Sequence, residues 1–166
     1  MTSTPAVRIR DLNQKNIRRD GQFVLYWMTA YRRLSSNFAL QRAAELARSQ
    51  QKPLLIVEGL RLDYPWASRR LHAFVLQGMR DNQTHAQRLK HCYVPFVETL
   101  PGQGGGMIEW LASRATTIVT DDFPCFFLPR MINAVARRID VKMEAVDSNG
   151  LFPMHVPETV FPTAYA

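Results

Sequence analysis

The stretch FVLYWMTAYRRLSSNFAL, residues 23–40, decides the predicted fold of this 166-residue chain. Residues 23–28 are all apolar or aromatic and follow the turn signal Asp20-Gly21, which is typical of a strand buried on both faces. The following residues are polar, and Ser35-Ser36-Asn37 offers cap residues for a helix. We therefore expect a central strand, a polar loop and a helix. In open α/β sheets, ligands bind at such loops.

Further apolar runs predict four more strands, alternating with helices, over residues 53–60, 92–97, 116–120 and 141–146. Pro95 removes a backbone donor, so the strand over 92–97 should lie at an edge of the sheet. The residues that should be nearly inaccessible are Leu25, Ile56, Val57, Ile118 and Val119. The pattern predicts an α/β fold, three layers α/β/α, with a five-stranded parallel sheet and right-handed crossovers.

The helices are predicted from their apolar spacing and their caps. One begins at Trp66 or Ala67, and its expected core stripe is Ala67, Leu71, Phe74, Val75, Gly78 and Met79. Another follows the glycine-rich residues 101–106. A third should start at Pro129, because proline fits the first helical turn but not the interior.

Composition limits the classes of function. The net charge of +7 and 46% hydrophobic content indicate a globular protein with an acidic partner, nucleic acid first. The arginines are spread along the chain, so they do not locate a site. No apolar run approaches the roughly 20 residues of a membrane span, and we expect a soluble, cytoplasmic protein with no membrane contact.

Several residues invite a chemical role without forming a known motif. Residues 101–106 lack the pattern of a phosphate loop and predict a turn with unusual backbone angles, although glycine amides before a helix can bind an anion. Asp121 and Asp122 should point opposite ways, with one capping the next turn. His72 and Cys92 are typical of structural residues, Cys92 as a small buried hydrophobe. No metal site is predicted.

The order of certain motifs resembles the class II cyclobutane pyrimidine dimer (deoxyribodipyrimidine) photolyases. The run Tyr26-Trp27-Met28, then Arg33 and Asn37 with Ala39-Leu40, is similar to the opening of that family's N-terminal domain. Residues 67–80, the corner TIVTDDFP and the ending at Val146-Asp147 continue the resemblance, which covers residues 8–153. It implies a lead-in over residues 1–20, an N-terminal α/β domain over 21–153 and the start of an interdomain linker over 154–166.

The resemblance implies strand order 3-2-1-4-5 and an antenna chromophore, a deazaflavin or methenyltetrahydrofolate, that passes excitation energy to FAD. FAD belongs to a C-terminal helical domain that this chain lacks, and DNA would bind mainly through that domain. We expect no catalytic residue here and an inactive isolated chain, whereas the parent protein would be a photolyase. The candidate chromophore-binding residues are Trp27, Met28, Thr29, Ala30, Arg32, Arg33, Asp121, Asp122 and Phe123.

Two other classes of function stay open. One is a standalone nucleotide-binding or signalling module of the same three-layer α/β architecture, with an adenine nucleotide at the same strand ends. The missing glycine-rich phosphate signatures weigh against it. The other is a plain interaction domain. The sequence leaves open which chromophore binds, if any, and the oligomeric state.

Overall fold

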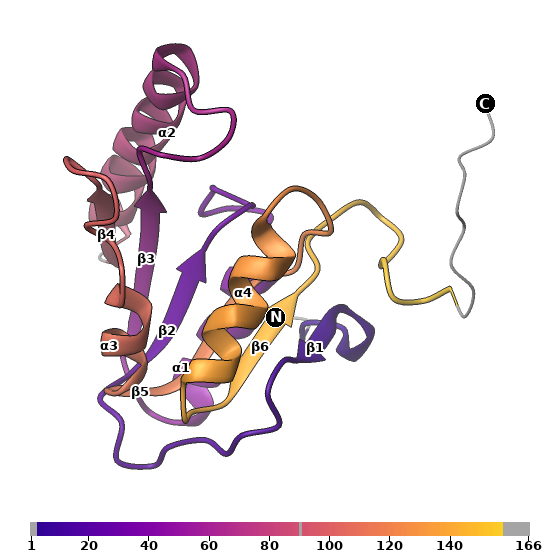
Figure 1. Ribbon diagram of the computed structural model, residues 1–166. Helices are drawn as coiled ribbons and strands as arrows, with labels where there is room; N and C mark the ends of the chain where they lie inside the picture. Colours follow the sequence, from indigo (N-terminus) through magenta and orange to yellow (C-terminus); the bar gives the residue numbers. More distant parts are fainter. Residues whose placement is uncertain (1–2, 90, 158–166) are drawn as a thin grey trace.

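The computed structural model describes residues 3–89 and 91–157. Over these residues the chain forms a mixed sheet with helices on both faces (Figure 1). The strands are β1 (Ile9–Asp11), β2 (Phe23–Met28), β3 (Leu54–Leu60), β4 (Cys92–Val97), β5 (Ala115–Asp121) and β6 (Met143–Val146). The helices are α1 (Phe38–Ser49), α2 (Arg69–Arg88), α3 (Met107–Ala112) and α4 (Leu128–Arg138), with a 3-10 turn η1 (Ala6–Arg8).

The described strands lie in the order β1-β6-β5-β2-β3-β4. The five predicted strands are present, parallel, and in the expected order, with β2 between β5 and β3. The prediction of a five-stranded, purely parallel sheet is wrong by one strand, because β1 adds antiparallel to β6 with Ile9 opposite Val146. The alternation Val7-Arg8-Ile9-Arg10 suggests an edge strand or an arm here, but its pairing with β6 could not be predicted locally, because the partner lies far along the sequence.

Alternation along β2 builds two cores, one on each face of the sheet. Val24, Tyr26 and Met28 face α1, whereas Leu25 and Trp27 belong to the cluster that packs with α3 and α4. The five residues predicted to be inaccessible are all at most 2% exposed, which confirms the predicted core. The arrangement is a three-layer α/β/α fold.

The helix starts follow their local signals. Asn37 caps α1, where its Oδ1 accepts a hydrogen bond from the Leu40 amide at 3.0 Å. Pro129 lies in the first turn of α4, as predicted. Helix α2 begins at Arg69 after the Ser68 cap, two or three residues later than expected.

The predicted core stripe on α2 is confirmed at Met79 and wrong in the first half of the helix. Phe74 is 73% exposed and Leu71 is also exposed, whereas Met79, Asn82 and Ala86 form the buried face. The reason is positional. The first half of α2 extends past the carboxyl ends of the strands, so no sheet lies beneath it to cover these side chains (Figure 1).

Strand β4 is an edge strand, as Pro95 predicted. Cys92, which was expected to be buried, is exposed because it begins this edge strand, and Cys125 is exposed as well. Among the helices of the described residues, none combines the length and the apolar character that a bilayer crossing requires.

Candidate functional site

The loop after the central strand is held by one carboxylate, that of Asp121 at the end of β5. Its Oδ2 accepts hydrogen bonds from the backbone amides of Thr29 at 2.8 Å, Ala30 at 2.7 Å and Tyr31 at 3.0 Å. Its Oδ1 accepts one from the Tyr26 hydroxyl at 2.7 Å. The carboxyl ends of the neighbouring parallel strands β2 and β5 are therefore tied together.

Burial governs the ionisation of this group. Desolvation raises the pKa of Asp121, and the hydroxyl and amide donors lower it only in part. Burial, followed by the nearby Asp121 charge, raises the pKa of Tyr26 well above its usual value. Asn37 completes the cluster, because its Nδ2 donates to the Tyr26 hydroxyl at 2.9 Å. These groups serve the architecture of the loop.

Asp122 has separate partners, which confirms that the two carboxylates point in different directions. Arg10 donates two hydrogen bonds to it at 2.9 and 2.8 Å, and His155 Nε2 lies 2.9 Å from Oδ2. Burial would raise the pKa of Asp122, but the hydrogen bonds from Arg10 and His155 bring it below its usual range. The prediction that one of them caps the next turn is wrong, since the donors to both carboxylates come from other segments and no side chain caps α4.

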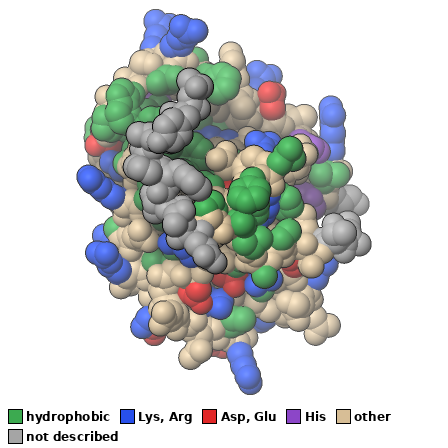
Figure 2. All heavy atoms as spheres, turned by 90° about the vertical axis from the view of Figure 1, so that its right-hand side faces the viewer, with side chains coloured by type: hydrophobic (Ala, Val, Ile, Leu, Met, Phe, Trp, Pro, Cys, Tyr) green, Lys and Arg blue, Asp and Glu red, His purple; other side chains and the backbone are tan. Residues whose placement is uncertain are grey.

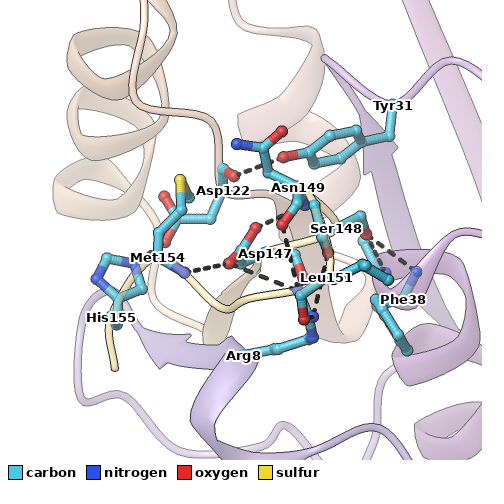
Figure 3. A network of polar contacts seen from close by, with 12 residues as sticks. Arg8, Tyr31, Phe38, Asp122, Asp147, Ser148, Asn149, Leu151, Met154 and His155 are labelled. Atoms are coloured by element: carbon cyan, nitrogen blue, oxygen red, sulfur yellow. Dashed lines mark hydrogen bonds and ion pairs between the residues drawn. The ribbon is translucent and has the colours of Figure 1, made fainter. Parts of the chain in front are cut away.

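A second polar cluster ties the beginning of the described chain to the segment after β6 (Figure 3). The buried Arg8 guanidinium donates to the backbone carbonyls of Asp147, Asn149, Gly150 and Leu151. Asp147 in turn accepts from the amides of Asn149 at 2.6 Å and Met154 at 2.7 Å. Sequence reasoning treated Arg8 only as part of a weak lead-in motif, because no local pattern announces these carbonyl partners.

A cavity of about 480 Å³ opens at the carboxyl ends of β2, β3 and β4. Its walls come from the strand ends, the glycine-rich loop before α3, one side of α4 and the loop before α2. The rings and apolar side chains that line it include Trp27, Leu60, Tyr64, Val75, Phe96, Ile108, Phe127 and Met131. The charged side chains at the cavity are Arg32, Arg61, Glu98, Glu109 and Arg138.

The predicted site residues divide into two groups. Trp27, Met28, Thr29 and Arg32 line the cavity, with Trp27 only 7% exposed. The remaining candidates lie away from its walls: Ala30, Arg33, Asp121, Asp122 and Phe123.

The two predicted loops do meet, since Asp121 bonds the loop after β2 and Phe123 packs edge-on against Tyr31 at 6.0 Å between ring centroids. The cavity does not open between these loops, although candidate residues of both loops were predicted to bind the chromophore. Asp121 fills that space, and the opening lies beside it, toward β3 and β4.

Two buried glutamates, which sequence reasoning missed, shape the walls of the cavity. Glu58 accepts from Arg32 Nη1 at 2.8 Å, Asn82 Nδ2 at 3.0 Å and the Tyr93 hydroxyl at 2.6 Å, so it fixes the Arg32 guanidinium. The pKa of Tyr93 is raised, by burial first and then by its bond to Glu58. Neither glutamate belongs to a motif. The one available signal was that Glu58 is the only charged residue in the apolar run of β3.

The other glutamate, Glu98, joins two loops. Its carboxylate accepts from the Gly104 amide and from the Leu62 amide, each at 3.0 Å. A Cβ on Gly104 would lie 3.1 Å from a Phe96 ring carbon, which explains a glycine at this close approach. Gly102 and Gly106 both have φ of +78°, which confirms the predicted turn with unusual backbone angles. Within the described ranges, no three His, Cys, Asp or Glu side chains are arranged to hold a metal ion.

Comparisons with known proteins find two similar enzymes that carry the same name. No protein-family profile matches the chain. It is 31% identical over 149 residues to a deoxyribodipyrimidine photo-lyase of Methanothermobacter thermautotrophicus, covering 90% of this chain and 33% of that protein. It is 30% identical over 135 residues to the enzyme of the same name from Arabidopsis thaliana, covering 79% of this chain and 26% of that protein.

Among solved structures, a universal stress protein family member from Burkholderia pseudomallei aligns with a TM-score of 0.43 at 20% identity, covering 72% of this chain and 93% of that one. The chain spans a third or less of the length of the two photo-lyases. Over that span, this protein is related to the deoxyribodipyrimidine photo-lyase family.

Proposed function

We propose that this chain is the N-terminal, antenna-chromophore domain of a class II photolyase, a protein that uses light to repair cyclobutane pyrimidine dimers in DNA. The observation that carries the proposal is the match along most of this chain to two photo-lyases, together with a cavity at the strand ends. The class follows the motif resemblance at Tyr26-Trp27-Met28 and Asn37.

The cavity fits a flat heteroaromatic body such as a deazaflavin or methenyltetrahydrofolate. Its volume of about 480 Å³ lies inside the range typical of small-molecule sites. Aromatic and aliphatic side chains form most of the walls, and a few charged groups can bind the polar edge of a ligand. Of these, Arg32 is already oriented by Glu58. The bound chromophore would supply light absorption, whereas this chain would bind it and exclude water.

Repair itself is assigned to the part of the photolyase that lies outside this chain. The organic chemistry of electron donation belongs to reduced FAD, and a protein supplies the site that buries it. In this proposal the FAD-binding helical domain is the partner of the α/β domain, and DNA binds mainly to that partner.

Chromophore binding is tested by blocking the cavity. Purified chain is mixed with 8-hydroxy-5-deazaflavin or with methenyltetrahydrofolate, and the bound fraction is measured by visible absorption after gel filtration. Val75→Trp places a large ring in the cavity wall and should weaken binding at least tenfold. The matched control Val94→Trp, on the exposed edge of the sheet, should bind like the wild type.

The same binding measurement, made with an adenine nucleotide, tests the alternative of a nucleotide-binding module. An adenine nucleotide that binds more tightly than both chromophores, and that Val75→Trp displaces, would favour the standalone nucleotide-binding module. Equal chromophore binding by the wild type and Val75→Trp would contradict the site assignment.

A further inference from the structure

Helix α2 carries most of the described arginines that the fold leaves unpaired. Most described arginines bond to carboxylates or backbone carbonyls or stack on an aromatic ring, as Arg10, Arg18 and Arg114 do. Among the described residues, the arginine side chains with no such partner are Arg19, Arg69, Arg70, Arg80, Arg88, Arg130 and Arg137. Four of these seven belong to α2.

These four arginines share one side of the helix. At 3.6 residues per turn they fall within an arc of about 100°, opposite the buried face of Met79, Asn82 and Ala86. From Arg69 to Arg88 they extend about 28 Å along the helix axis. Asp81 is the sole acidic residue of α2. The result is a long basic face with almost no opposing charge.

The placement of Arg69 and Arg70 is locally unfavourable. Both lie in the first turn of α2, which contains no acidic residue, and the helix dipole disfavours positive charge there. No described carboxylate offsets this repulsion. Residues that are unfavourable for the local structure, and that gain no contact in return, tend to mark functional positions. A bound anion would neutralise the repulsion between these two arginines and the helix dipole.

Exposed aromatic rings stand beside the start of this face. Trp66 is 57% exposed and Phe126 is 68% exposed, and their ring centroids lie 5.3 Å apart. Trp66 precedes the first arginine of α2 by three residues. In Figure 2, which keeps the vertical axis of Figure 1, Lys and Arg side chains project at the top of the molecule, the end at which α2 extends. Arginines beside solvent-facing aromatic rings are the usual elements of a single-strand binding surface.

We propose that the four arginines of α2, together with Trp66 and Phe126, form a binding surface for single-stranded nucleic acid. The arginines neutralise successive phosphates, and the two aromatic rings stack on unpaired bases. The four arginines and Trp66 lie outside the walls of the chromophore cavity, whereas Phe126 also lines it.

The test measures fluorescence anisotropy of a labelled 20-nucleotide oligothymidylate with the full chain, over a series of salt concentrations. Arg80→Ala with Arg88→Ala should weaken binding about tenfold and make the salt slope shallower by about 1.4, since each lost phosphate contact contributes about 0.7. The control, Arg19→Ala with Arg137→Ala, removes the same charge elsewhere and should change binding less than about threefold.

The aromatic contribution is tested in parallel. Trp66→Ala should weaken binding at least fivefold, as expected for the loss of one stacked base. Trp110→Ala, which removes a tryptophan of similar exposure on α3, should leave binding unchanged. Circular dichroism checks that each variant is folded, and all these side chains are exposed.

Three results would overturn the proposal. One is equal weakening by the two double-arginine variants, which would indicate a diffuse charge effect. Another is a 20-base-pair duplex that binds as tightly as the single strand and is insensitive to Trp66→Ala. The last is tight binding to vesicles containing phosphatidylserine with no binding to the oligonucleotide, since a basic helix with exposed Leu71 and Phe74 also suits a membrane surface.

Discussion

The carboxylate of Asp121 organises the ligand-facing end of the sheet although it does not itself line the cavity. It gathers three consecutive backbone amides and one phenol from the central strand and its loop. The loop conformation that places Thr29 and Arg32 at the cavity therefore depends on a residue of the neighbouring strand.

Replacing Asp121 by Ala should lower the free energy of unfolding by about 3 to 5 kcal/mol, because several buried donors lose their acceptor. Asp121→Asn keeps one acceptor oxygen and should lose less. Urea titration measures both. The matched control is Asp140→Ala, whose side chain is 85% exposed and which should change stability by under about 0.5 kcal/mol. Equal losses at Asp121 and Asp140 would contradict this role.

The lowered pKa of Asp122 predicts how its contribution to the stability of the fold changes in acid. Its folded-state pKa lies below the ordinary value of 3.8, so its contribution to stability is complete above that value and is lost as the pH falls through the lower, folded-state pKa. The stability difference between the wild type and Asp122→Asn should therefore be constant near neutral pH and shrink below about pH 4. Urea titrations from pH 7 to pH 3 check this, and a difference that grows on acidification would refute it.

Asp121 should behave with the opposite sign. Its pKa is raised by burial, so the folded state holds its proton more tightly than the unfolded state. Its contribution is then largest in acid and decreases as the pH rises through the raised pKa. The two adjacent carboxylates therefore respond in opposite directions to the same change of pH.

At the scale of elements, α2 departs most from its sequence pattern. Apolar spacing gave a correct helix but a buried stripe that starts too early, because spacing shows which residues share a side and not whether a sheet lies against it. The second half of α2 packs through Met79, whereas Phe74 in the first half meets solvent.

Paired variants of α2 test this division. Met79→Ala should cost about 2 to 4 kcal/mol, through lost burial and a cavity, whereas Phe74→Ala should cost under about 0.5 kcal/mol. Thermal or urea unfolding of the isolated chain provides the measurement. A comparable loss at both positions would mean that the first half of the helix is also packed.

The contact between Arg8 and the segment after β6 is a second element-scale feature. Arg8→Ala would leave the buried Asp147 carbonyl and three partly buried carbonyls without their donor, and should destabilise the chain by about 2 kcal/mol. Arg8→Lys keeps the charge but not the planar fork, so its effect should be intermediate. Hydrogen exchange should accelerate at the Asn149 and Met154 amides in Arg8→Ala and remain unchanged at the core of β2.

For the whole molecule, the proposed division of labour predicts that this chain does not repair DNA. Purified chain, reduced FAD and dimer-containing DNA under near-ultraviolet light should give no repair above a protein-free control. Repair above that control would place the catalytic site within the described fold, where no helical layer provides a site for FAD.

The parts of this architecture that rest on local chemistry were predictable. Apolar runs located β2 to β6, and Asn37 and Pro129 located two helix starts. The rest depends on contacts between distant segments. The pairing of Ile9 with Val146 and the bonds of Glu98 to two loops have no local signature. Only four of the nine candidate residues line the cavity. The end of a strand predicts which edge of the sheet holds a ligand, but it does not predict on which side of that edge the cavity lies.

The antiparallel strand β1 has a consequence for how the chain is made. Among the described strands, β1 leaves the ribosome before the others and its partner β6 after them, so more than a hundred residues are synthesised while the backbone groups of β1 wait for this partner. The central strand can pair with β3 far sooner, because only about one helix separates them. Biosynthesis thus builds this sheet outward from its middle. Strand β1 takes its final place only after β6 has emerged, although it is translated long before it.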